Sequence, residues 1–126
     1  MAEAGEERRL PTQWVEVELG APYGGWKAKG VGNLSPFLVI GTRQRINEYL
    51  SSEGDARTIG LEAGMYDAII GFLREVLIPN GEWNFVDREG KPMPLTGESL
   101  RRLPGDLLWA LYIASVEAII KLPPPS

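Results

Sequence analysis

The chain has 126 residues and a formal net charge of −4 at pH 7, and it contains neither cysteine nor histidine. This length suits a single domain with a modest hydrophobic core. The missing residue types exclude disulfides, thiol chemistry and histidine-based catalysis, and the acidic balance argues against a nucleic-acid partner, which clustered Lys and Arg would bind.

Neither end of the chain is typical of a targeting or membrane segment. The N-terminal MAEAGEERRL is polar and lacks the apolar centre of a signal peptide, so we expect residues 1–11 to form a disordered tail. The longest apolar run, from Leu107 to Val116, falls short of the roughly 18 residues that a membrane span needs. We therefore expect no membrane partner and a cytoplasmic location.

Two alternating segments predict an N-terminal β-hairpin. Residues 14–19 (WVEVEL) place three apolar side chains on one face and two glutamates on the other, which is the period of a half-buried strand. The turn-forming residues 21–25 (APYGG) separate this strand from a second alternating segment at 26–29. We expect Trp14 and Trp26 to cover one another across the hairpin.

The segment from Leu34 to Gly54 permits two interpretations. Ser35 and Pro36 form a good N-cap and first-turn pair, which predicts a helix that begins there. Alternatively, the apolar run 37–40 is a short buried strand and Thr42 caps a later helix. The run FLVI fits the strand somewhat better, although periodicity alone does not decide short apolar runs.

A second helix is predicted from about Ile59 to Leu77. Its apolar residues recur at spacings of three and four, while charged residues occupy the other side. Three glycines, at 60, 64 and 71, weaken this helix, and either a close backbone approach or plain tolerance accounts for them. The apolar face comprises Met65, Tyr66, Ile69, Ile70, Leu73, Val76 and Leu77.

Turn chemistry and proline dominate the next stretch. Residues 83–85 and 91–93 flank the sequence DREG, which predicts a hairpin closed by a longer loop. Pro92 and Pro94 favour an extended path after it. Thr96 is a candidate N-cap for a short helical turn, and Pro104 is expected at the first position of the last helix.

The last helix is apolar almost all the way round, which predicts burial on most sides. A domain this small has little material to surround it, so we expect part of its surface to meet a partner or another copy of the chain. The competing interpretation is that the other elements cover all of it. The residues predicted to face a partner are Trp109, Tyr112, Ile113, Val116 and Ile120.

No catalytic constellation is visible in the sequence. The aspartates are spread over separate elements, so carboxylate metal binding is not expected. The serines have no histidine to activate them, and the glycines do not form a phosphate-binding loop. We expect a protein that is not an enzyme and that uses no cofactor or metal.

The C-terminal half carries a recognisable order of residues. Its motif combines a Trp-Asn-Phe strand, a loop with Asp and Gly, spaced prolines, and the start of a helix. The matching positions are Trp83, Asn84, Phe85, Asp87, Gly90, Pro92, Pro94, Leu95, Thr96, Leu103, Pro104, Asp106, Leu107, Leu108, Ala110 and Leu111. In this motif the chain resembles the small tail assembly chaperones of long-tailed bacteriophages, firmly from Trp83 to Leu111 and more loosely over the N-terminal strands.

The resemblance implies a non-enzymatic role in the host cytoplasm. Such chaperones are thought to coat the tape measure protein and keep it soluble while the tail tube assembles, and they are absent from the finished virion. A longer frameshifted product recruits the tail tube protein in many phages. The alternative is a structural phage protein, such as a tail-completion or head–tail joining subunit, that stays in the virion.

Together these observations predict one α+β domain over residues 12–122. We expect a small antiparallel sheet or pair of hairpins packed on two or three helices, with a proline-rich tail at 123–126. The expected partners are the tape measure protein, the tail tube protein through an extended product, and a second copy of the chain.

Overall fold

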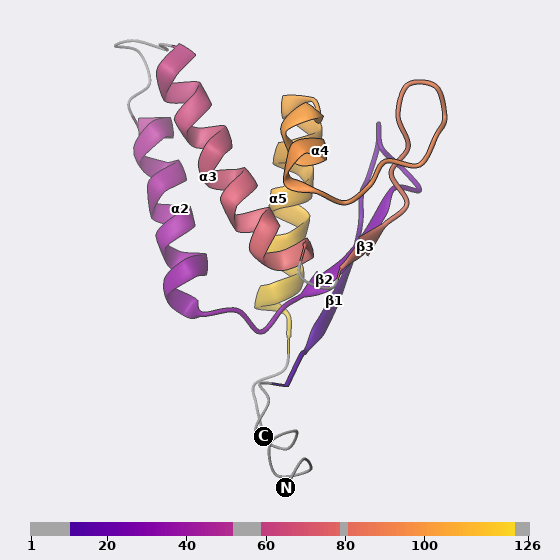
Figure 1. Cartoon of the computed structure of the whole chain (residues 1–126). Coiled ribbons are helices and arrows are strands. Elements are labelled where there is room, and N and C mark those ends of the chain that lie inside the picture. The colour runs from indigo at the N-terminus through magenta and orange to yellow at the C-terminus, as the bar shows by residue number, and fades with distance from the viewer. Residues whose placement is uncertain (1–10, 52–58, 79–80, 123–126) are drawn as a thin grey trace, which may run out of the picture.

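The computed structural model (Figure 1) describes residues 11–51, 59–78 and 81–122. This part of the chain forms a three-stranded antiparallel sheet and four helices, which confirms the predicted α+β class. The tails predicted at the two ends lie outside the described residues, apart from Pro11. No helix in the described part is both long and apolar enough to cross a membrane.

The sheet has the order β1-β2-β3, so that β2 is its central strand. Strand β1 (Trp14–Glu18) pairs with β2 (Lys27–Val31) as the predicted hairpin, and β3 (Glu82–Trp83) pairs with β2 on its other side. The alternation of β1 places Val15, Val17 and Leu19 in the core, with at most 6% of each side chain exposed.

The two N-terminal tryptophans do not cover one another, contrary to the prediction. Trp14 pairs with Val31, at the opposite end of the hairpin from Trp26. Trp14 lies on the solvent face, where the Lys29 Nζ is 5.2 Å from its ring centroid. Trp26 follows the turn and packs on Phe85, with 4.8 Å between the ring centroids.

Helix α2 (Pro36–Ser51) begins where the capping residues predict it, so the interpretation of residues 37–40 as a strand is wrong. The Phe37 amide donates a hydrogen bond of 3.2 Å to the Ser35 Oγ, which satisfies one of the free amides of the first turn. A narrow stripe of Leu38, Val39, Thr42 and Ile46 faces the rest of the protein.

Helix α3 (Ile59–Leu77) has the predicted bounds, and its C-terminal half forms the centre of the core. It packs on β2 so closely that a side chain at Gly30 would collide with the Val76 carbonyl oxygen. Gly81, just before β3, is equally confined between the carbonyl oxygens of Leu77 and Lys29. The sheet and α3 therefore touch through their backbones.

The C-terminal helices follow the predicted capping chemistry. Thr96 is the N-cap of α4 (Gly97–Arg102). Helix α5 (Gly105–Ile120) begins one residue later than expected, because Pro104 is its N-cap and not its first residue. Asp106 lies in the first turn, where the positive end of the helix dipole favours a carboxylate.

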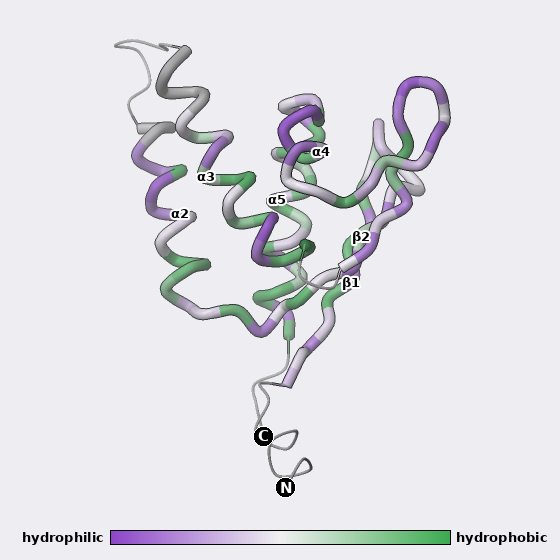
Figure 2. The backbone as a smooth tube through the Cα atoms, in the orientation of Figure 1, coloured by the Kyte–Doolittle hydropathy of each residue, from purple (hydrophilic) through white to green (hydrophobic). Residues whose placement is uncertain are grey.

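The helices cover one face of the sheet and leave the other open to solvent (Figure 1). Helix α3 packs on β2, α5 packs on β1, and α2 packs on the outer side of α3. Figure 2 shows an apolar stretch at the beginning of α2, away from the sheet. Buried residues of β1, β2, α2, α3, α4 and α5, together with Phe85, form a single core cluster.

The glycine contacts generate a paired prediction about stability. Gly30→Ala pushes β2 away from α3, because the new Cβ would lie 2.9 Å from Val76 Cγ1, and we expect it to lower the free energy of unfolding by about 1–3 kcal/mol. Gly71→Ala adds a methyl group to the exposed side of α3, where nothing lies within 4 Å, and should raise the free energy of unfolding by about 0.5–1 kcal/mol. Urea unfolding measures both, and equal effects would contradict the close approach of β2 to α3.

Candidate binding surface

The structure divides the five residues predicted to face a partner into two groups. Tyr112 and Val116 are buried, with 3% and 8% of the side chain exposed, and the Tyr112 ring meets the Phe72 ring edge-on at 5.4 Å. They are core residues because this side of α5 packs against α3. Ile113 and Ile120 are 37% and 62% exposed, and Trp109 is half-buried.

Helix α2 contributes two exposed apolar residues that the sequence analysis did not select. Phe37 is 87% exposed and Ile40 is 52% exposed. Assigning residues 37–40 to a buried strand hid them. The available signal was helical spacing, because Phe37 and Ile40 lie three residues apart, on the side of the helix opposite the buried Thr42 and Ile46.

Arg43 of α2 lies near enough to Tyr112 of α5 to affect its titration. Burial raises the pKa of Tyr112, and the nearby Arg43 guanidinium opposes this by lowering the same pKa. Arg43 therefore lies within electrostatic range of α5, and Ile40 lies three residues before it on α2. We call Phe37, Ile40, Trp109, Ile113 and Ile120 the α2–α5 face.

A separate groove of about 790 Å³ lies between the β1–β2 turn, the loop after β3, and helices α4 and α5. Its aromatic wall is formed by Tyr23 and Trp26, whose ring centroids are 5.7 Å apart. Much of the remaining lining is proline or apolar side chain, comprising Val86, Pro92, Met93, Pro94, Leu103, Pro104 and Leu107.

The polar residues of the motif hold this part of the protein together. Asn84 Oδ1 accepts from the Lys27 amide at 2.7 Å, and its Nδ2 donates to the Gly25 carbonyl at 2.9 Å, so Asn84 ties β3 to the hairpin turn. Asp87 Oδ1 accepts from two amides of its own loop, which Gly90 closes with a φ of 82°. These side chains are structural.

Aromatic and hydroxyl contacts complete the same framework. The Trp83 ring stacks on Phe85 at 4.4 Å, and its indole N–H donates to the Met93 carbonyl at 2.8 Å. The Tyr23 hydroxyl donates to the Asp106 carboxylate at 3.0 Å. Burial, this hydrogen bond and the carboxylate charge all raise the pKa of Tyr23, so the hydroxyl keeps its proton at neutral pH.

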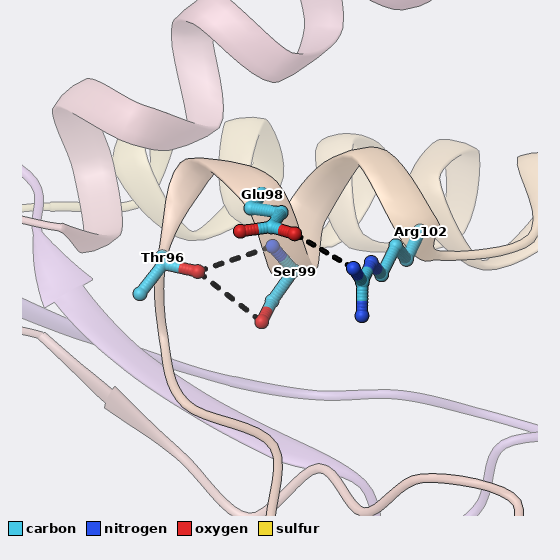
Figure 3. Close-up of polar contacts among 4 residues, drawn as sticks. All are labelled: Thr96, Glu98, Ser99 and Arg102. Carbon is cyan, nitrogen blue, oxygen red and sulfur yellow. Dashed lines mark hydrogen bonds and ion pairs between the residues drawn. The ribbon is translucent and has the colours of Figure 1, made fainter.

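Helix α4 forms one side of the groove, and Figure 3 shows how its first turn is fixed. The Ser99 amide donates to Thr96 Oγ1 at 3.1 Å, and the two hydroxyls are 3.2 Å apart. Glu98 and Arg102 form an exposed ion pair at 2.6 Å, which adds little to stability because water screens it.

The described residues contain no group of three or more acidic side chains that could hold a metal ion. Comparison with protein-family models, curated proteins and solved structures finds no match to this chain. The described surface offers exposed apolar side chains on α2 and α5 and an apolar groove beside the motif.

The electrostatic effect of Arg43 on Tyr112 predicts a change in tyrosine titration. Arg43→Met removes the charge that favours the phenolate, so the pKa of Tyr112 should rise further above its ordinary value of 10.0. Because the folded pKa exceeds the unfolded one, the contribution of Tyr112 to stability is complete below pH 10 and is lost as pH rises through the folded pKa. NMR of ring-labelled tyrosine follows each residue separately.

Arg45→Met is the matched control, because Arg45 lies on the same helix two residues away and on a different side. It should leave the titration of Tyr112 unchanged. Equal curves for the Arg43 variant and the original chain would show that α2 does not approach α5 as described.

Proposed function

We propose that this protein is a non-enzymatic phage tail assembly chaperone, which binds the tape measure protein and keeps it soluble while the tail tube assembles. The observation that carries the proposal is the α2–α5 face, where both helices leave large apolar side chains exposed. The motif from Trp83 to Leu111, which resembles this chaperone family, supports it independently.

The α2–α5 face suits an amphipathic helical client. A client helix laid along α2 and α5 would cover Ile40, Ile113 and Ile120 with its own apolar stripe, which is the helix-in-groove mode of recognition. The tape measure protein is expected to be long and largely helical, so it offers many such stripes.

The size of the face predicts weak, reversible binding. Full burial of one Ile or Phe side chain contributes roughly 1.5–3 kcal/mol, and these side chains are already partly covered. Association costs at least about 4 kcal/mol in lost freedom of motion. Each copy therefore binds loosely, which suits a chaperone that polymerising tube subunits must displace, and many copies along one client would provide the necessary coverage.

The proposed role places the protein in the host cytoplasm and outside the finished particle. A longer product that recruits the tail tube protein belongs to the same proposal. Mass spectrometry of purified virions distinguishes it from the alternative of a tail-completion or head–tail joining subunit, because a chaperone is lost from the particle and a structural subunit is retained in stoichiometric amounts.

Co-expression with the tape measure protein encoded by the neighbouring gene tests the function directly. We expect the unmodified chain to increase the soluble fraction of the tape measure protein several-fold, and Ile40→Asp or Ile120→Asp to abolish most of that gain. Both side chains are more than half exposed, so the substitutions should leave the melting temperature nearly unchanged.

Arg45→Asp serves as the control, since it places an equal new carboxylate on α2 away from α5. It should preserve the gain in solubility. An unchanged soluble fraction with the unmodified chain would refute the chaperone function, whereas equal activity of the Asp variants would refute only the assignment of the face.

A further inference from the structure

Among the described residues, no strand pairs with the outer edge of β1. It is the outer strand of the sheet, and the register with β2 fixes which of its groups are used. The Leu19 amide donates to the Trp26 carbonyl and the Gly32 amide donates to the Gln13 carbonyl, so the odd-numbered residues bond to β2. The N–H and C=O groups of Trp14, Glu16 and Glu18 therefore point outward.

The side chains along this edge are acidic and fully accessible. Glu16 and Glu18 lie on the solvent face of β1, where the described structure places no helix. Along the edge that pairs with β2, the two glutamates lie opposite lysines: Glu16 pairs with Lys29 and Glu18 pairs with Lys27. Opposite charges directly across a strand pair stabilise a sheet. The lysines of β2 therefore indicate that a strand with basic side chains pairs well with β1.

Helix α5 covers the inner face of β1. It packs over β1, and its half-buried alanines at 110, 114 and 118 form one ridge at a spacing of four residues. Ala114 lies about 200° around the helix from Tyr112, which contacts α3, so the ridge faces away from α3. Small side chains there leave room for the inward-pointing residues of an added strand.

A second copy of the chain is a poor occupant of this edge. Antiparallel pairing of two β1 strands about their centres would place Glu16 opposite Glu16, and like charges directly opposite are destabilising. The central strand β2, whose lysines would suit β1, already has a neighbour on each side in the same chain.

We propose that β1 binds an extended segment of a partner protein that carries Lys or Arg at every second residue, with small or β-branched apolar residues between them. The segment adds a fourth strand to the sheet. Its basic side chains lie beside Glu16 and Glu18 on the solvent face, and its apolar side chains rest on the alanine ridge of α5. This site is independent of the α2–α5 face.

The probe is the peptide acetyl-Lys-Val-Lys-Val-Lys-amide, with acetyl-Glu-Val-Glu-Val-Glu-amide as its charge-reversed match. NMR titration of the full chain should give a Kd at least tenfold lower for the lysine peptide. In the free protein the amides of Trp14, Glu16 and Glu18 should exchange faster than those of Val15 and Val17. Saturation with the lysine peptide should slow exchange of these three amides at least tenfold.

Two variants separate the strand edge from simple charge attraction. Glu16→Pro removes an N–H that points outward and is not used by β2, so it should keep the fold and raise the Kd for the lysine peptide at least tenfold. Glu16→Lys combined with Glu18→Lys should reverse the preference toward the glutamate peptide. If the proline variant does not fold, the test is whether the lysine peptide slows amide exchange at Trp14, Glu16 and Glu18 in the unmodified chain.

Equal binding of the two peptides, or lysine-peptide binding without slowed exchange at Trp14, Glu16 and Glu18, would overturn the proposal. So would dimerisation of the chain with protection of the same three amides, because a second copy would then occupy the edge. Neither result bears on tape measure solubility, and a failure of the chaperone test leaves the peptide test intact.

Discussion

The close backbone approach between β2 and α3 sets the geometry of the whole domain. Gly30 and Gly81 leave no room for side chains at this contact, so the sheet lies directly against the end of α3. The sheet itself is minimal, since β3 has only two residues, and such a small sheet is stable only when its face is covered. Once α3 occupies the area over β2, α5 must cover β1, and α2 packs outside α3.

The unusual composition of α5 follows from these neighbours. One side covers β1 and another packs against α3, so much of an almost wholly apolar helix is used inside the domain. Its Ile113 and Ile120 remain exposed, as do Phe37 and Ile40 on α2. The charge of Arg43 lies close to this part of the protein, because it affects the titration of Tyr112.

Local sequence patterns predicted much of the fold, whereas the features set by tertiary packing were not predictable from them. Alternation identified β1, helical spacing identified α3 with its bounds, and the Thr96 cap identified α4. The run 37–40 misled because only Leu38 and Val39 face the core, whereas Phe37 is 87% exposed and Ile40 is 52% exposed. Of the candidate site, Ile113 and Ile120 were predicted, but Tyr112 and Val116 were misassigned because the side of α5 that meets α3 is set by tertiary contacts. The groove joins segments distant in sequence, and no local pattern reveals it.

The cover of β1 by α5 also affects how the protein is made. These two elements stand at opposite ends of the described chain, and Gly32 is in contact range of both the Gln13 carbonyl and Leu122. During synthesis the N-terminal hairpin leaves the ribosome long before α5, so the apolar face of β1 has no native cover until α5 has also emerged. The contact between β1 and α5 therefore forms late in synthesis, since it joins segments far apart in the sequence.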